Sequence, residues 1–539
     1  MLEAWRPNAV RPPSSGSTSS TSGAGPEAAW PVPVGAARLT LEDVLAVALG
    51  GRPVALAPDP AFRARVEASR ALLAGLLRDG AEVYGVTTGY GDSCTVPVPP
   101  ELVEELPAHL SRYHGCGLGR ILDPEETLAV LVARLTSLAQ GCSGVRWELL
   151  EALAALINHR ILPRIPAEGS VGASGDLTPL SYVAATLMGE REALHRGRVR
   201  PAREALAEEG LPALALAPKE ALALMNGTGV MTGLACLAFH RAEHLSRLAC
   251  RLTALAVACL RGNRDHFHPA LSRLKPHAGQ GEAAAWIYAD LGGAAEPGSA
   301  DRLQDRYSIR CAPHVIGVLQ DALPWIRRDL ENELNSANDN PLFDGERGLM
   351  LNGGHFYGGH VAFAMDALKV AVANLADLMD RQLALLVDPR YSNGLPGNLS
   401  GAEGARAAIN HGLKGVQIGA SAWTAEALKL TLPASVFSRS TECHNQDKVS
   451  MGTIAARDCL RVLELTAQVG AALVLAVVQG LELRRRQGVP ALERLSAEAR
   501  RELEQMAGGV PFVAEDRPLD TVLGALAGRI QACAWSLYR

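Results

Sequence analysis

The sequence contains few aromatic residues and no strong excess of either charge. Only 4% of its 539 residues are Phe, Trp or Tyr, and 52 Lys and Arg face 57 Asp and Glu, giving a formal net charge of −5. A charge so close to balance argues against the dominant phosphate-binding surface that nucleic-acid-binding proteins carry. We therefore expect a small organic molecule as the partner, and no nucleic acid.

The patterns that mark metal, disulfide and membrane proteins are missing as well. The ten cysteines form no Cys-x-x-Cys pair, so they indicate neither a zinc site nor a disulfide framework, and they fit a reducing cytoplasm. His355 and His360 have no third ligand at helical spacing, which argues against a metal. The almost uncharged run from Gly470 to Gly480 is shorter than the ~20 residues that a membrane-spanning helix needs, so we expect no membrane span.

The N-terminus lacks the apolar core of a secretory signal. Its prolines and the Ser/Thr/Gly run from Ser14 to Gly25 indicate a disordered tail over residues 1–36. The rest of the chain is helical in pattern, and strand-period alternation is scarce. Asp59-Pro60 and Asp123-Pro124 each combine a helix cap with a first-turn proline.

These patterns predict an all-α protein. We divide it into an N-terminal domain over residues 37–210 and a bundle of long central and C-terminal helices over residues 211–539. Several of the later helices are apolar on most sides, which predicts burial inside a large bundle or against other subunits.

Ala173-Ser174-Gly175 can close into an electrophilic ring. If the amide nitrogen of Gly175 attacks the carbonyl carbon of Ala173 and two waters leave, the product is a 4-methylidene-imidazol-5-one ring (MIO) with a methylene derived from Ser174. Gly175 has no Cβ, so its nitrogen can approach in a backbone geometry closed to other residues. Taken alone, the same residues also fit an ordinary loop in which Asp176 caps an apolar helix.

The surrounding residues favour the ring. The segment from Gly169 to Leu180 closely resembles the cofactor segment of the aromatic amino acid ammonia-lyase family, which includes the histidine, phenylalanine and tyrosine ammonia-lyases and related aminomutases. The resemblance implies a helical bundle of the fumarase and aspartase type and an MIO cofactor formed autocatalytically from Ala173, Ser174 and Gly175, without metal or nucleotide. It also implies a homotetramer in which several subunits contribute to each active site.

Other family motifs follow in order along the chain. The loop from Tyr84 to Gly91 resembles the glycine-rich loop that holds a tyrosine over the cofactor, which implies that Tyr84 removes the β-proton of the substrate. Asn226 resembles the asparagine that contacts the ring and the substrate amine. Because an ordinary tyrosine has a pKa near ~10, Tyr84 needs a nearby cation or helix N-terminus to act as a base at neutral pH.

The segment from Gln304 to Arg310 matches the family motif Gln-Asp-x-Tyr-Ser-x-Arg. The planar guanidinium of Arg310 suits the substrate carboxylate, and the resemblance places Tyr307 and Gln304 in the site. Phe356 matches a stacking phenylalanine, although His355 stands where the family has asparagine.

The last motifs lie near the end of the resemblance. Glu426 resembles the glutamate that faces the substrate, and Asn445 and Gln446 belong to a block that supports the cofactor.

Two motifs disagree about the substrate. Tyr113-His114 matches the pair that faces the substrate ring, which is Ser-His in histidine lyases, His-Leu in tyrosine lyases and Phe-Leu in phenylalanine lyases. A buried His114 without a partner would cost ~1–3 kcal/mol, which favours imidazole or phenol over plain phenyl. The block from His444 to Asp447 resembles the phenylalanine and tyrosine enzymes instead. We therefore expect tyrosine slightly ahead of histidine, with phenylalanine third.

The expected reaction is elimination of ammonia to give 4-coumarate, urocanate or cinnamate. A 2,3-aminomutase that makes a β-amino acid is the main alternative, and a homologue that binds an aromatic ligand without chemistry is the other. The residues that carry the family's chemistry are all present, which favours an enzyme: Tyr84, Ser174, Asn226, Arg310 and Glu426.

Overall fold

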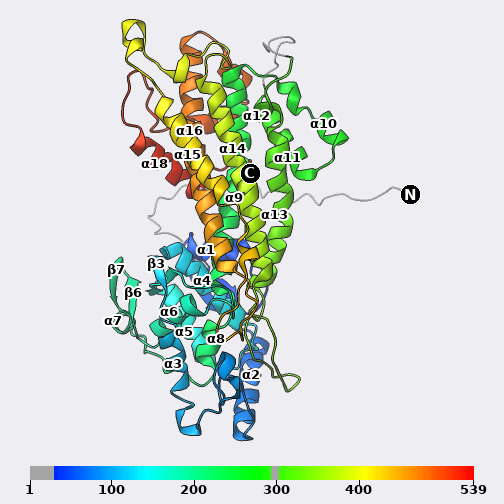
Figure 1. The fold of residues 1–539 in the computed structure, drawn as a ribbon, viewed down its shortest axis with the longest axis vertical. Helices are drawn as coiled ribbons and strands as arrows, with labels where there is room; N and C mark the ends of the chain where they lie inside the picture. Colours follow the sequence, from blue (N-terminus) through cyan, green and yellow to red (C-terminus); the bar gives the residue numbers. More distant parts are fainter. Residues whose placement is uncertain (1–29, 293–302, 539) are drawn as a thin grey trace, which may run out of the picture.

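Long helices dominate the molecule, which we describe from a computed structural model covering residues 30–292 and 303–538 (Figure 1). Residues 1–29, which form most of the expected tail, lie outside the described residues. The predicted all-α fold is confirmed. Five long helices form the upper bundle in Figure 1: α9 (Gly229–Leu260), α13 (Ala312–Leu334), α14 (Gly359–Val387), α15 (Lys414–Lys429) and α16 (Gly452–Arg486).

The core of this bundle lies where α9, α14 and α16 pack against one another, with α13 against α9 and α14. Smaller helices cover its ends and sides: α10 (Pro269–Leu274), α11 (Ala278–Asp290), α12 (Tyr307–Arg310), α17 (Ala497–Ala507) and α18 (Asp520–Gln531).

The apolar helix α16 is longer than the uncharged run suggested. Among the described residues it is long and apolar enough to cross a membrane, with a mean hydropathy of 1.8 over its most apolar 18-residue window. That window is 83% buried inside the protein, so the apolar residues of α16 pack against other helices of the bundle.

The N-terminal part of the chain forms a lobe of shorter helices at the lower end of the bundle in Figure 1. The two cap-and-proline signals are confirmed, because α2 begins after an Asp59 N-cap and α4 begins with a capping box between Asp123 and Glu126. The helices of this part are α1 (Leu41–Ala48), α2 (Pro60–Arg78), α3 (Leu106–Tyr113), α4 (Pro124–Leu138), α5 (Trp147–Asn158), α6 (Leu177–Leu187), α7 (Ala202–Glu208) and α8 (Glu220–Met225).

Within residues 30–292 and 303–538, short strands form four small sheets. β1 (Val32–Val34) pairs in parallel with β2 (Val54–Leu56), and the remaining pairs are antiparallel. β1 lies in the stretch that the sequence assigned to a disordered tail. Residues 32–34 instead form a strand, in which Val32 and Val34 are fully buried. The other strands are β3 (Leu118–Ile121), β4 (Leu162–Pro163), β5 (Pro166–Glu168), β6 (Glu192–His195), β7 (Arg198–Pro201), β8 (Leu342–Asp344) and β9 (Leu349–Leu351).

The expected boundary near residue 210 remains a prediction. Helix α8 follows that boundary but packs against α3 and α6, and the long helices begin only with α9. Residues on both sides of the expected boundary therefore build the same lobe.

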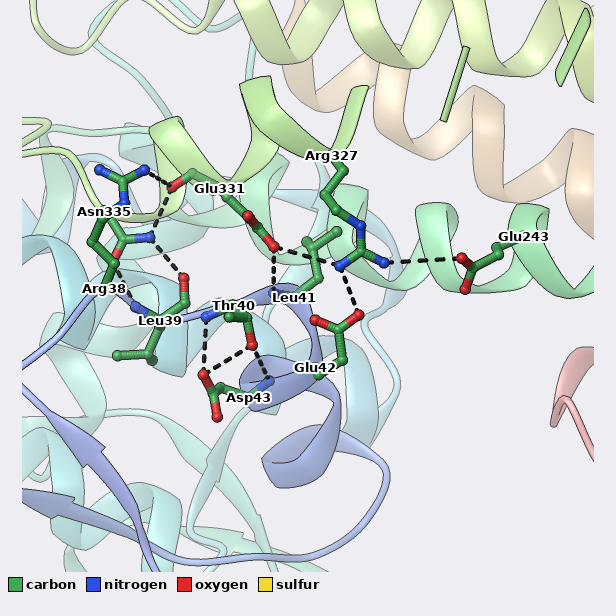
Figure 2. Close-up of polar contacts among 10 residues, drawn as sticks. All are labelled: Arg38, Leu39, Thr40, Leu41, Glu42, Asp43, Glu243, Arg327, Glu331 and Asn335. Carbon is green, nitrogen blue, oxygen red and sulfur yellow. Dashed lines mark hydrogen bonds and ion pairs between the residues drawn. The ribbon is translucent and has the colours of Figure 1, made fainter. Parts of the chain in front are cut away.

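A polar network ties residues 38–43 to the bundle (Figure 2). Asn335, which follows α13, exchanges two hydrogen bonds of 2.8 Å with the backbone of Leu39. Arg327 of α13 binds Glu42 of α1 at 2.6 Å and Glu331 at 3.5 Å. Burial raises the pKa of Glu42, but the hydrogen bond and charge of Arg327, together with hydrogen bonds from the backbone and Thr40, outweigh burial and lower the pKa. The start of α1 is thus fixed on α13.

Candidate active site

A left-handed glycine shapes the segment Ala173-Ser174-Gly175. Gly175 has φ +73°, and a Cβ at this position would lie 2.1 Å from the carbonyl oxygen of Gly227. The two backbones are joined by a bond of 2.8 Å from the Asp176 N–H to the Gly227 carbonyl and by one of 3.2 Å from the Gly227 N–H to the Ser174 carbonyl. Only glycine therefore allows this close pairing.

The buried side chain of Asp176 anchors the segment Ala173-Ser174-Gly175. Its side chain is fully buried and accepts the N–H groups of Val230 and Met231 at 3.0 and 2.9 Å, together with hydroxyl bonds from Ser170 and Thr453. Burial raises the pKa of the carboxyl, and these hydrogen bonds oppose the rise. The Asp176 side chain thus caps α9 rather than α6, the helix that the loop interpretation assigned to it.

A cavity of about 530 Å³ opens beside Ser174. It is built from the loop after α2, the end of α3, the cofactor segment, α8 and the turn before α16. The residues that line it are Tyr84, Gly89, Tyr90, Gly91, Ser93, Leu110, Tyr113, His114, Ser174, Leu177, Leu222, Asn226, Glu442 and Gln446.

Tyr84 lies in this cavity, with its hydroxyl oxygen accepting the Gly91 N–H at 2.8 Å. Burial raises the pKa of Tyr84, the Gly91 bond opposes the rise, and the negative charge of Glu442 adds to it. The stabilisation that a phenolate needs is therefore not supplied within the described part of a single chain.

Asn226 and Gln446 reach the cavity from segments that are far apart in the sequence. The Asn226 side chain is buried, and its Oδ1 has no hydrogen-bond partner in the described structure. Such an atom is costly to bury, and it is free to accept a hydrogen from a ligand. Gln446 donates from Nε2 to the Ser174 hydroxyl at 3.2 Å, and its Oε1 accepts the Thr441 hydroxyl at 2.9 Å.

Glu442 is a cavity residue that the sequence analysis missed. Both of its carboxylate oxygens accept the Asp92 N–H, at 3.0 and 3.1 Å, so it joins the Tyr84 loop to the turn that carries Gln446. Glu426 does not line the cavity; it lies on α15 and binds Arg461 at 2.7 Å. The signal in the sequence was the position of Glu442 four residues before Gln446, just ahead of the block from His444 to Asp447.

Tyr113 and His114 are also in the cavity wall, with ring centroids 4.5 Å apart. Burial lowers the pKa of His114 to about 4, so the imidazole is neutral at physiological pH. Burial likewise raises the pKa of Tyr113, which stays a neutral phenol. The expected ring-facing pair therefore offers neutral hydrogen-bonding groups.

The chain does not bring all of the expected site residues together. Arg310 lies on α12, in the bundle and away from the lower lobe (Figure 1), where its Nε donates to the Asp305 carbonyl at 3.0 Å. Tyr307, beside it, is 72% exposed. Eight expected residues do not line the cavity: Ala173 and Gly175, which flank Ser174, and Gln304, Tyr307, Arg310, Phe356, Glu426 and Asn445.

The described residues contain no group of three or more His, Cys, Asp or Glu side chains that could hold a metal ion. The chemistry of the cavity rests on phenol, hydroxyl, amide, imidazole and carboxylate groups.

Comparison with known proteins identifies the relatives of the chain. The family profile described as aromatic amino acid lyase matches residues 39–504. A tyrosine ammonia-lyase of Cereibacter sphaeroides is 40% identical over 510 residues, which cover 91% of this chain and 95% of that protein. A histidine ammonia-lyase of Gloeobacter violaceus is 41% identical over 449 residues, covering 83% and 86%.

Solved structures show the same fold. The tyrosine aminomutase of Streptomyces globisporus superposes with a TM-score of 0.86 at 34% identity, covering 94% of this chain and 97% of that one. A histidine ammonia-lyase of Trypanosoma cruzi superposes with a TM-score of 0.84 at 31% identity, covering 94% of each chain.

Proposed function

Because the chain belongs to the aromatic amino acid lyase family and is an enzyme of the carbon–nitrogen lyase type, we propose that it eliminates ammonia from an aromatic L-amino acid. The product is the corresponding α,β-unsaturated acid. The observation that carries this proposal is the cavity in which Tyr84, Ser174, Asn226 and Gln446 converge.

The proposed cofactor is MIO, formed from Ala173, Ser174 and Gly175. The left-handed Gly175, the Gln446 bond to the Ser174 hydroxyl and the unpartnered Asn226 Oδ1 are all compatible with the group and with an amine beside it. When formed, it would supply an electrophile that no natural side chain offers.

Tyr84 is the proposed base for the β-proton of the substrate. Its phenol lies in the cavity wall, and the hydrogen bond from the Gly91 N–H fixes the position of the phenol oxygen. Burial and Glu442 raise the pKa of Tyr84, so we assign the opposing positive charge to another subunit in the assembled enzyme.

Asn226 and Glu442 are the proposed contacts of the substrate amine, one as a buried acceptor and the other as a carboxylate. Glu442 takes the place that the sequence pattern gave to Glu426, which binds Arg461 outside the cavity.

The carboxylate of the substrate requires a second chain. Arg310 lies outside the cavity of its own chain, so we propose that Arg310 of the partner subunit, with its Tyr307 and Gln304, completes each site. Apolar side chains stand exposed along the bundle, where a homotetramer would bury them: Tyr307, Val318, Phe363 and Ile418 are each at least 60% exposed.

Tyrosine is the proposed substrate, ahead of histidine and then phenylalanine. The neutral His114 can accept the phenol hydroxyl of tyrosine, whereas phenylalanine would leave it without a partner. A histidine relative and a tyrosine relative match the chain almost equally well, so identity alone favours neither.

A 2,3-aminomutase is the second candidate. The similarity to a tyrosine aminomutase structure favours it, because a mutase and a lyase use the same residues and differ in whether the amine returns to the β-carbon.

A cytoplasmic location is also proposed, since the ten cysteines are free thiols.

Separate incubation with tyrosine, histidine and phenylalanine, followed by identification of each product, tests this function. An unsaturated acid with free ammonia supports the lyase, and a β-amino acid supports the mutase. Tyr84→Phe is expected to abolish turnover while the helical circular dichroism signal stays unchanged. Turnover of none of the three by wild-type protein, or full activity in Tyr84→Phe, would contradict the proposal.

A further inference from the structure

Gly227 separates the cofactor segment from a buried arginine. On one side its backbone pairs with Ser174 and Asp176. On the other side, a Cβ built on Gly227 would lie 1.9 Å from Nη1 of Arg134 and 2.3 Å from the carbonyl oxygen of Asn338. The backbone that supports Ser174 therefore rests directly on these two groups.

Arg134 is itself held in one place. Its side chain projects from α4 and is fully buried, with Nη2 donating to the Ala223 carbonyl at 2.6 Å and Nη1 donating to the Asn338 carbonyl at 3.3 Å. Ala223 belongs to α8, the helix that ends just before Asn226 and Gly227. One planar guanidinium thus fixes α8 and the loop after α13 relative to α4.

Asn338 is fixed from a second direction. Its N–H donates to the hydroxyl of Ser137 at 3.0 Å, and its Nδ2 donates to Glu333 at 3.0 Å. Ser137 lies on α4, three residues after Arg134. The same helix therefore positions both groups that Gly227 rests on.

The charge of Arg134 is balanced by buried carboxylates. Burial lowers the pKa of Arg134 to about 10, while Asp339 and Asp176 act in the opposite direction, so the guanidinium is charged at neutral pH. Asp339 also binds the fully buried Lys219 at 2.6 Å. Arg134 does not line the cavity, so it can act on the cofactor segment only through the backbone.

We propose that Arg134 is a positioning residue for closure of the Ala173-Ser174-Gly175 ring, acting through Gly227 and Asn338. This inference rests on the proposed function, which requires the ring. Ring closure brings the Gly175 nitrogen onto the Ala173 carbonyl carbon, and a rigid Gly227 keeps the paired backbone from moving away during that approach.

The step balances without an oxidant. The Gly175 nitrogen forms a bond to the Ala173 carbonyl carbon, and the carbonyl oxygen leaves as water with the amide hydrogens of Gly175 and Ser174. A second water carries away the Ser174 hydroxyl and the Ser174 Cα hydrogen.

Intact-mass spectrometry of freshly synthesised chains tests the role of Arg134. Wild-type protein made by cell-free translation is followed over time for loss of the mass of two waters, beside Arg134→Lys and Ser137→Ala. We expect Arg134→Lys to slow the loss by roughly 10- to 100-fold, because misplacement by about 1 Å has an effect of that size, and Ser137→Ala to slow it less. Circular dichroism reports whether each variant folds.

Arg484→Lys is the matched control. Arg484 is also buried and also donates to backbone carbonyls, those of Cys259 at 2.8 Å and Ser392 at 2.7 Å, but it lies on α16 outside the cavity. Its variant is expected to lose two waters at the wild-type rate.

The outcomes distinguish failure of the proposed function from failure of the role of Arg134. A wild-type chain that never loses two waters contradicts the proposed function itself. Loss at the wild-type rate in both Arg134→Lys and Ser137→Ala, or equal slowing in Arg484→Lys, overturns the role of Arg134. If Arg134→Lys does not fold, Ser137→Ala decides: slower loss supports the inference and the wild-type rate overturns it.

Discussion

Tyr84 is the residue whose chemistry depends most on its immediate surroundings. It lies among uncharged groups and one carboxylate, and both burial and Glu442 raise its pKa. As the proposed base, Tyr84 would act in its deprotonated form, so we expect the rate to rise with pH through the pKa of Tyr84. Any change that removes negative charge from this cavity shifts that rise to lower pH.

Glu442→Gln is therefore expected to move the acid limb of the kcat/KM profile to lower pH. The same variant should lower kcat/KM by roughly 10- to 100-fold, since a hydrogen bond to a charged group contributes ~1.5–3 kcal/mol. Glu426→Gln is the comparison, because Glu426 binds Arg461 outside the cavity. Steady-state kinetics from acid to alkaline pH measure both effects. A larger loss in Glu426→Gln than in Glu442→Gln would return the amine contact to Glu426.

At the scale of elements, the contact between α1 and α13 depends on one arginine. Arg327 reaches Glu42 and Glu331, and it also lies 4.9 Å above the ring of Phe239 on α9 (Figure 2 shows the polar part). Three elements therefore meet at a single partly exposed guanidinium.

Arg327→Met should lower the free energy of unfolding by ~1 kcal/mol, because partly exposed ion pairs contribute little individually. The loss should shrink at high salt, which screens such pairs. Urea denaturation at low and high salt measures it. Arg328→Met is the control on the same helix, since Arg328 is mostly exposed and pairs only with the adjacent Asp329 among the described residues. An equal loss in both variants would mean that the network adds nothing.

Local signals explain which elements the sequence could predict. The starts of α2 and α4 were predictable because the Asp59 and Asp123 caps act within a few residues. β1 was not, since Val32 and Val34 are ordered by pairing with β2 and by burial, both of which are tertiary contacts. Glu442 was not predicted for the same reason, because its bond to the Asp92 N–H joins residues 350 positions apart.

At the scale of the whole molecule, a buried charge cluster holds the last described residues of the chain against the helical bundle. Arg251 of α9 binds Asp290 of α11 at 2.6 Å and Glu502 of α17 at 3.0 Å. Tyr538 stacks under the Arg251 guanidinium and donates its hydroxyl to Asp290. Burial raises the pKa of Asp290 to about 7, with the Arg251 charge opposing that rise.

This cluster predicts a pH-dependent stability. A carboxyl group whose pKa is higher in the folded than in the unfolded protein stabilises the fold fully below its unfolded pKa, near ~3.9. For Asp290 this stabilisation is lost as the pH rises through about 7. This rise in the pKa of Asp290 corresponds to ~4 kcal/mol at most. The melting temperature of the wild-type protein should therefore fall between pH 4 and 7, and Asp290→Asn should make this fall smaller. Thermal unfolding across this range checks it, with Glu504→Gln as the control, because Glu504 is an exposed residue of α17. An unchanged slope in Asp290→Asn would contradict it.

The distance between Arg310 and the cavity of its own chain also has a genetic consequence. Ser174→Ala and Arg310→Ala chains should each be inactive alone, because one lacks the proposed electrophile and the other the proposed carboxylate anchor. Co-expressed, they should recover about one quarter of wild-type activity, since half of the cavities are intact and half of those meet an intact arginine. Activity of purified mixed tetramers measures this. No recovery would show that each chain serves only itself; recovery would make this enzyme one in which two defective alleles complement each other.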